Sequence, residues 1–213
     1  MPRRYLLWDH DGVLVDTERL YFEATREVLG AIGVELGQGT YLAYMADGRS
    51  CWDLARSAGL SEGRIGEHRA RRDSLYQEKL RSEPIEIAGV REVLAELGAS
   101  HRMAIVTSAR RADFDLIHES SGLLEFFEFA LTSEDYARSK PDPAPYLAAL
   151  ERFGAHPRDA LALEDSVRGL KSACRAGLDC VVVMSPFTAS QDFAMAWRVV
   201  DSIREVPELL AVA

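Results

Sequence analysis

A chain of 213 residues with 47% apolar and 28% charged side chains can bury a core as one domain, with or without an insertion, and is too apolar to be disordered. Its 34 acidic and 25 basic residues give a net charge of −9, which disfavours binding to nucleic acid or to an anionic membrane surface. Three scattered cysteines (Cys51, Cys174, Cys180) and the lack of a long apolar run exclude a disulfide framework, a secretion signal and a membrane span, so we expect a cytoplasmic protein with reduced, buried thiols.

The first half of the chain begins with a strand and continues with helices. The apolar run at 5–8 predicts a buried strand, and the periodicity over 17–30 predicts an amphipathic helix. No convincing strand follows before position 83. Three further helical stretches fill this region, near 39–46, 50–58 and 61–81.

Helices and strands alternate in the rest of the chain. We expect strands at 103–106, 129–132, 160–163, 180–184 and 198–200. We expect helices at 90–97, 111–121, 144–153 and 167–176. This alternation predicts an α/β fold with a doubly wound parallel sheet. The core is expected at 1–16 and 84–213, with a helical cap inserted at 17–83.

Polar side chains that can do chemistry lie at the ends of three of these strands, and a lysine lies in the loop after a fourth. They are Asp9 and Asp11, Thr107 and Ser108, Lys140, and Glu164 and Asp165. In an open parallel sheet, ligands bind outside the carboxyl ends of the strands. Carboxylates, hydroxyls and a lysine at one such edge suit a metal-assisted reaction on a phosphorylated substrate.

Each of these groups also has a simpler interpretation. Thr107 and Ser108 could cap a helix, and Lys140 could be a solvated loop lysine. Ser166 could cap the helix at 167–176, with Glu164 merely near its positive end. All of these interpretations would have to hold at one edge of the sheet, so we favour a shared site.

The order and spacing of the motifs resemble the haloacid dehalogenase superfamily. The resemblance rests on DHDGVLVDT at 9–17, Thr107, the Lys140-Pro141 pair and LEDS at 163–166, and it covers essentially the whole chain. The most similar branch holds phosphatases and β-phosphoglucomutase-like proteins, which have a helical cap after the first strand. The resemblance implies a Rossmann-like core that carries this cap.

The roles of the residues are likewise implied by the resemblance. Asp9 would attack phosphorus and become a transient aspartyl phosphate, and Asp11 would act first as general acid and then as general base. Mg²⁺ would be held by Asp9, the backbone carbonyl of Asp11 and Asp165, with Glu164 acting through a bound water or from behind the ligands. Lys140 would neutralise the phosphoryl oxygens and tether Asp9, and Thr107 and Ser108 would donate hydrogen bonds to the same oxygens.

The function expected from the resemblance is a Mg²⁺-dependent phosphatase for a small phosphorylated metabolite, such as a sugar phosphate or a phosphoglycolate-like acid. A phosphomutase of the β-phosphoglucomutase type is the alternative. The mutases carry a histidine in the first cap helix where our alignment places Tyr21, which favours hydrolysis. A catalytically idle binding protein is a third possibility, and the complete set of motif residues counts against it.

Two cap residues, Arg49 and Tyr21, are candidate substrate contacts, although Arg49 could also be an ordinary exposed arginine at a helix start. The partner is expected to be a small phosphorylated substrate, for a monomer or weak homodimer. His10 departs from the family, which usually has an apolar residue at this position. Because successive strand side chains point to opposite faces, we expect His10 to face away from Asp9 and Asp11, either as a satisfied core histidine or as one that supports the site residues from behind.

Overall fold

The computed structural model describes residues 3–211, which form two compact units. The first unit contains the chain before Thr17 together with the chain from Glu86 onward, and the second unit is Thr17–Ile85. The sequence predicts that the inserted helical segment ends at position 83. Residues 84 and 85 also fall in the second unit, because the chain first pairs with the sheet unit at Glu86, in a bridge to Val15.

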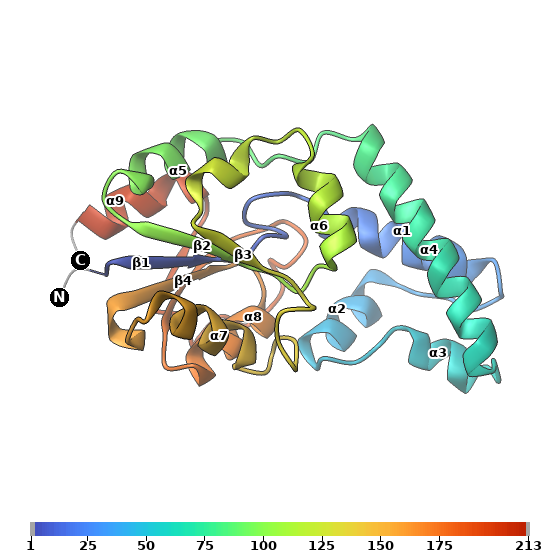
Figure 1. The fold of residues 1–213 in the computed structure, drawn as a ribbon. Coiled ribbons are helices and arrows are strands. Elements are labelled where there is room, and N and C mark those ends of the chain that lie inside the picture. Colours follow the sequence, from blue (N-terminus) through green and yellow to red (C-terminus); the bar gives the residue numbers. More distant parts are fainter. Residues whose placement is uncertain (1–2, 212–213) are drawn as a thin grey trace. The chain divides into compact units, whose positions relative to one another are not determined.

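Six parallel strands form the sheet of the first unit, in the order β3-β2-β1-β4-β5-β6 (Figure 1). They are β1 (Tyr5–Trp8), β2 (Arg102–Val106), β3 (Phe129–Leu131), β4 (Ala160–Glu164), β5 (Asp179–Val183) and β6 (Arg198–Val200). The predicted doubly wound parallel sheet is confirmed. Trp8 pairs with Ile105 on one side and Leu163 on the other, so the carboxyl ends of β1, β2 and β4 meet at one edge.

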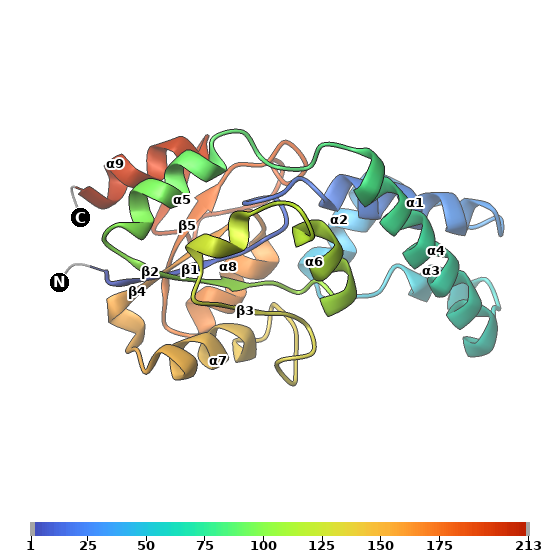
Figure 2. The ribbon, with the colours of Figure 1, turned by 45° about the horizontal axis from the view of Figure 1, so that its top comes forward.

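Helices cover both faces of this sheet, as Figures 1 and 2 show. They are α5 (Val90–Gly98), α6 (Arg111–His118), α7 (Ala144–Phe153), α8 (Val167–Arg175) and α9 (Val206–Ala211), with short 3₁₀ turns at Leu123–Phe126, Pro157–Asp159 and Ile203–Glu205. Side chains of β1 alternate between the faces: Leu6 and Trp8 pack with α5 and α9, and Leu7 packs with α7 and α8.

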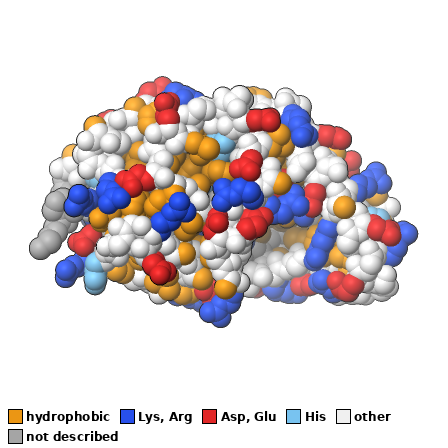
Figure 3. Space-filling view, viewed as in Figure 1, with side chains coloured by type: hydrophobic (Ala, Val, Ile, Leu, Met, Phe, Trp, Pro, Cys, Tyr) orange, Lys and Arg blue, Asp and Glu red, His pale blue; other side chains and the backbone are white. Residues whose placement is uncertain are grey.

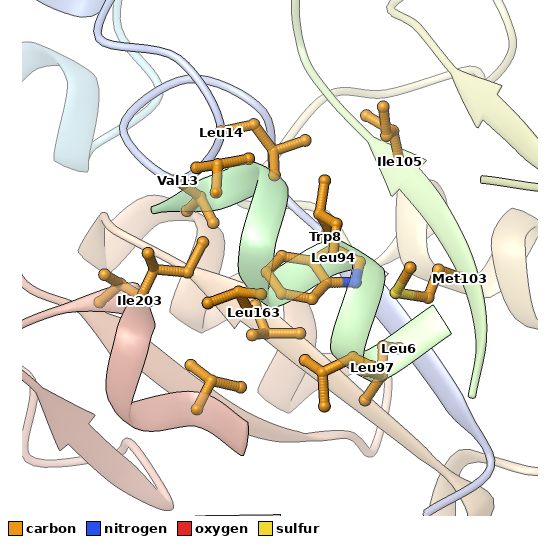
Figure 4. Packing of buried hydrophobic residues seen from close by; sticks show 14 of the residues in the cluster. Leu6, Trp8, Val13, Leu14, Leu94, Leu97, Met103, Ile105, Leu163 and Ile203 are labelled. Atoms are coloured by element: carbon orange, nitrogen blue, oxygen red, sulfur yellow. The ribbon is translucent and has the colours of Figure 1, made fainter. Parts of the chain in front are cut away.

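The buried indole of Trp8 lies at the centre of the first core cluster (Figure 4). Leu94, Met103 and Leu163, from α5, β2 and β4, surround it. Large aromatic side chains contribute much of the apolar area that a core buries. This packing therefore holds the end of β1 firmly at the point where Asp9 follows.

The second unit is entirely helical, as expected. It comprises α1 (Glu18–Gly30), α2 (Gln38–Ala46), α3 (Trp52–Ser57) and α4 (Glu62–Ser82). Two ion pairs link α1 to α4 and the residue after it: Lys79 contacts Glu23 at 3.2 Å, and Arg19 contacts Glu83 at 2.7 Å. The apolar face of α1 is buried, as its 3.6-residue periodicity predicts.

The predicted helix that begins at position 111 is shorter than expected. The periodicity indicated 111–121, yet α6 ends at His118, and Gly122 adopts a left-handed conformation with φ +66°. Glycine adopts this conformation without steric cost, so the chain turns here instead of continuing the helix. The turn brings the Ser121 hydroxyl back to His118, at 2.7 Å from its Nδ1.

The surface and the thiols match a chain of ordinary composition. Basic and acidic side chains lie next to one another on the face shown in Figure 3. Ion pairs between exposed side chains include Arg102 with Glu128, at 2.6 Å. Within residues 3–211 all three cysteines are free; Cys174 is only half-buried. No helix in this range combines the length and the apolarity needed to cross a bilayer.

Candidate active site

Asp9 and Asp11 follow β1 in a tight loop. The backbone N–H of Asp9 donates to the carbonyl of Leu163 at 2.8 Å. The hydrogen bonding to β4 therefore continues for one residue beyond the end of β1. Gly12 has φ +80°, and a Cβ there would lie 2.1 Å from Oδ2 of Asp165. Glycine is needed at this position both for the backbone conformation and for the close approach of the loop to Asp165.

Lys140 connects the carboxylates of two strands. Its Nζ donates to Oδ1 of Asp9 and to the carbonyl of Val106, both at 2.8 Å, and lies 2.7 Å from Oε1 of Glu164. Lys140 is 3% exposed, so the interpretation as a solvated loop lysine is wrong. Burial opposes its charge, but Asp9 and Glu164 outweigh burial and hold the pKa of Lys140 above its usual range.

Three buried carboxylates gather at the ends of β1 and β4. One oxygen from each of Asp9, Glu164 and Asp165 lies within 4.8 Å of the others. Burial, with Asp9 nearby, raises the pKa of Glu164, and Lys140 opposes this rise. Oε2 of Glu164 is buried and has no hydrogen-bond partner among the described residues. Clustered carboxylate oxygens of this kind fit a hard divalent cation, which would relieve their mutual repulsion.

Thr107 and Ser108 follow β2. The Thr107 hydroxyl donates to Oδ2 of Asp11 at 3.3 Å and accepts from the N–H of Ala109 at 3.0 Å. The N-cap of α6 is Arg110, so Thr107 and Ser108 do not cap this helix, which begins at position 111 as predicted. The hydroxyl oxygen of Ser108 is buried and unpartnered among the described residues.

The structure adds two tyrosines that the sequence reasoning missed. The hydroxyl of Tyr146, on α7, donates to Oε1 of Glu164 at 2.5 Å. The hydroxyl of Tyr136 donates to the carbonyl of Thr107 at 2.6 Å. In the sequence Tyr146 only continues the apolar stripe of its helix, so no local signal distinguishes it from a core aromatic residue.

Comparison with known proteins identifies the family. The family model described as haloacid dehalogenase-like hydrolase matches residues 6–183, which include every one of these strand-end groups. The chain belongs to this family. The resemblance that the motifs indicated is therefore confirmed, and hydrolysis is the reaction class that membership supports.

The haloacid dehalogenase-like relatives of this chain cover nearly its whole length. CbbY of Rhodobacter capsulatus is 30% identical over 98% of this chain and all of its own. Fructose-1-phosphate phosphatase YqaB of Escherichia coli is 28% identical over 86% of this chain and 98% of its own. The crystal structure of CbbY from Rhodobacter sphaeroides with phosphate has a TM-score of 0.79 at 26% identity, covering 97% and 96% of the two chains. Phosphatase activity is the hydrolase function that membership of this family and phosphatase relatives such as YqaB support for the chain.

The two cap residues singled out in this haloacid dehalogenase-like chain differ in exposure. Arg49 is exposed, and its guanidinium lies 4.0 Å from the ring centre of Tyr44. Tyr21 is half-buried, with the guanidinium of Arg72 at 4.1 Å over its ring and Tyr76 edge-on at 5.2 Å. Their assignment as substrate contacts stays a prediction.

Gly169, in α8, lies so close to Glu164 that a larger residue there should destabilise the protein. A Cβ on Gly169 would lie 1.8 Å from Oε2 of Glu164, whose other oxygen is held by Lys140 and Tyr146. We expect Gly169→Ala to lower the free energy of unfolding by about 1–3 kcal/mol, the usual cost of overpacking a core. Urea unfolding at neutral pH measures this change in the free energy of unfolding.

Gly66→Ala is the matched control for that substitution. Gly66 lies inside α4, and nothing lies within 4 Å of a Cβ built on it. Alanine there should stabilise the protein by up to about 1 kcal/mol, because glycine disfavours a helix interior. Equal stability of Gly169→Ala and the wild-type protein would show that Glu164 can move aside.

Proposed function

We propose that the protein is a Mg²⁺-dependent phosphatase that hydrolyses a small phosphorylated metabolite through an aspartyl-phosphate intermediate. The observation that carries the proposal is the buried contact network at the carboxyl ends of β1, β2 and β4. In it, Lys140 joins Asp9 to Glu164, and Thr107 contacts Asp11. These are the groups that a nucleophilic carboxylate, a proton donor and a phosphate-binding cation require.

Asp9 is the nucleophile in this proposal. Its carboxylate forms a bond to phosphorus while the bond from phosphorus to the ester oxygen breaks, and Asp11 gives its proton to the departing oxygen. In the second step Asp11 takes a proton from water as the water oxygen bonds to phosphorus and the bond between phosphorus and the Asp9 carboxylate breaks, which releases inorganic phosphate and regenerates Asp9. Lys140 holds Asp9 in place at 2.8 Å and supplies positive charge to the phosphoryl oxygens.

The metal requirement is part of the same proposal. Mg²⁺ would be held by Asp9, Asp165 and the backbone carbonyl of Asp11. Glu164 already contacts Lys140 and Tyr146, so it would support these ligands without binding the ion directly. When bound, the ion would offset the repulsion between the anionic substrate and the carboxylates. Thr107 and Ser108 would donate hydrogen bonds to the phosphoryl oxygens.

The substrate class follows from the relatives. YqaB is named for fructose 1-phosphate, and a variant of Rhodobacter sphaeroides CbbY, with a TM-score of 0.81 and 25% identity, was crystallised with xylulose 1,5-bisphosphate. A phosphatase from Nitrosospira multiformis that is 28% identical over 90% of this chain and 88% of its own is named for phosphoglycolate. A sugar phosphate or a short phosphorylated acid is accordingly the substrate we propose.

The experiment that tests the proposal is phosphate release from a panel of sugar phosphates and phosphoglycolate, with Mg²⁺ and with EDTA. We expect release from at least one compound with Mg²⁺ and a loss of about 10³-fold or more with EDTA, because charge stabilisation dominates phosphoryl transfer. Release that is unaffected by EDTA would exclude the metal. Conversion of a hexose phosphate to its isomer with a bisphosphate primer, without phosphate release, would assign the protein to the mutases.

A further inference from the structure

A buried pair of histidines adjoins Asp11. His10 is 0% exposed, and its Nε2 lies 2.9 Å from Nε2 of His118, the last residue of α6. Nδ1 of His118 lies 2.7 Å from the Ser121 hydroxyl oxygen, which accepts a hydrogen bond from the N–H of Leu123 at 3.2 Å. Polar contacts therefore run from the loop of Asp11 through two imidazole rings to the turn after α6.

The tautomers of the two rings are linked, because each contact has room for one hydrogen. Burial, together with His10, lowers the pKa of His118 to about 3, so this ring is neutral at neutral pH and carries a single N–H. If Ser121 donates to Nδ1 of His118, then His118 donates from Nε2 and His10 carries its hydrogen on Nδ1. In the opposite arrangement the Ser121 hydrogen has no recorded acceptor within residues 3–211.

The other ring nitrogen of His10 lies beside the proposed proton donor. Nδ1 of His10 lies 3.5 Å from Oδ2 of Asp11 and has no hydrogen-bond partner among the described residues. An N–H at this nitrogen attracts the carboxylate, whereas a lone pair would repel it. The Thr107 hydroxyl donates to the same oxygen at 3.3 Å. Catalytic hydrogen bonds are often long without substrate and shorten in the reacting complex.

We propose that His10 is a positioning residue that orients Asp11 for proton transfer, with its own hydrogen directed by His118 and Ser121. The inference rests on the proposed role of Asp11 as general acid and base. Together with Thr107, His10 engages Oδ2 and so sets the rotation of the carboxyl group, and the proton passes to the leaving group, or from water, through Oδ1. His10 neither gains nor loses a proton in either step.

The consequence depends on the leaving group. A sugar alkoxide is a poor leaving group and needs the proton that Asp11 supplies, whereas 4-nitrophenolate leaves readily as an anion. A misplaced Asp11 should therefore slow the first step for an alkyl phosphate more than for an aryl phosphate. Loss of packing alone would slow the first step for both substrates alike.

The test measures single-turnover release of the leaving group, which isolates the first step. The probes are 4-nitrophenyl phosphate and fructose 1-phosphate, or whichever alkyl phosphate the panel finds to react faster. His10→Phe keeps a ring against Phe114, which is 5.2 Å away, and removes the N–H. We expect it to lower the alkyl-to-aryl rate ratio about tenfold or more, with the half-saturating substrate concentration changed less than about threefold. His10→Asn, whose amide can replace Nδ1–H, should recover most of the ratio.

Three further variants make the result decisive. Phe114→Leu disturbs the same pocket without removing a nitrogen, and it should leave the ratio unchanged. His118→Phe removes the partner that directs the His10 hydrogen, and it should lower the ratio about threefold. This variant replaces His10→Phe as the test if His10→Phe does not fold. Asp11→Asn sets the scale of the full effect.

The outcomes separate the inference from the proposed function. A low ratio in Asp11→Asn with a wild-type ratio in His10→Phe and His118→Phe would overturn the role of His10 alone. A wild-type ratio in Asp11→Asn would overturn the proposed acid role of Asp11, and with it the inference. An equal fall of the ratio in Phe114→Leu would assign the effect to packing.

Discussion

Asp9→Asn is expected to abolish phosphate release. An amide oxygen is far less nucleophilic than a carboxylate, so the first bond to phosphorus should not form, and we expect a loss of about 10⁴-fold or more in kcat. The substitution keeps the shape of the side chain, and Lys140 retains Glu164 as an ion-pair partner at 2.7 Å. The variant should therefore unfold at a temperature close to that of the wild-type protein.

Asp201→Asn is the matched control for this variant. Asp201 also follows a strand at the same edge of the sheet, directly after β6, but it is exposed and outside the carboxylate cluster. Its activity should equal that of the wild-type protein within about twofold, as for most surface substitutions. Substantial turnover by pure Asp9→Asn would require another nucleophile, such as water activated elsewhere in the site, and would refute the aspartyl phosphate.

Lys140→Met is expected to have the largest effect on stability. The ammonium group lies between two carboxylates, Asp9 at 2.8 Å and Glu164 at 2.7 Å, and all three are buried. Removing one partner of a buried ion pair leaves uncompensated charge and typically costs about 3–5 kcal/mol. We expect a loss of this size in the free energy of unfolding at pH 7, measured by urea denaturation without divalent cations.

The pH dependence of this loss has a definite sign. Burial raises the pKa of Glu164, and removing the opposing lysine raises it further. Between the unfolded and the folded pKa the folded variant binds more protons than the unfolded chain, so its stability falls as the pH rises through this window and recovers as the pH drops. The deficit relative to the wild-type protein should therefore be smaller at pH 5 than at pH 8.

Lys140→Met combined with Glu164→Gln is the control. Removing both charges should recover part of the lost stability, because a neutral amide is less costly to bury than a lone carboxylate. A deficit below about 1 kcal/mol in the single variant would show that water or a protonated carboxyl group replaces the lysine without penalty.

Much of the site could be predicted because its signals are local. The apolar run before Asp9, the two residues after Val106 and the acidic pair after Leu163 each mark the end of a strand in the sequence itself. Since parallel strands place their carboxyl ends at one edge, alternation of strands and helices was sufficient to predict that these groups meet. The structure places them on β1, β2 and β4, which are neighbours in the sheet.

Other features could not be predicted from local signals. Lys140 lies in an irregular loop, and only the family resemblance, not its own neighbourhood, predicted that it tethers Asp9, which lies 131 positions away. Strand alternation predicted that His10 faces away from Asp9 and Asp11. The strand ends at Trp8, however, and the loop that follows brings Nδ1 of His10 within 3.5 Å of Oδ2 of Asp11. The opposite-face prediction is therefore wrong, and the contact fits the alternative of a histidine that supports a site residue. The expected burial of His10 is confirmed.

The sequence by itself determined the fold class, the strand ends and the chemical types at the site, because hydrophobic periodicity and short motifs depend only on neighbouring residues. The tertiary structure alone decided which of these groups touch. The strand order placed Asp9 and Glu164 at the ends of neighbouring strands, where Lys140 contacts both, and the packing of α6 placed His118 against His10, 108 positions away. Such contacts depend on how distant segments pack together, and no local pattern encodes that packing.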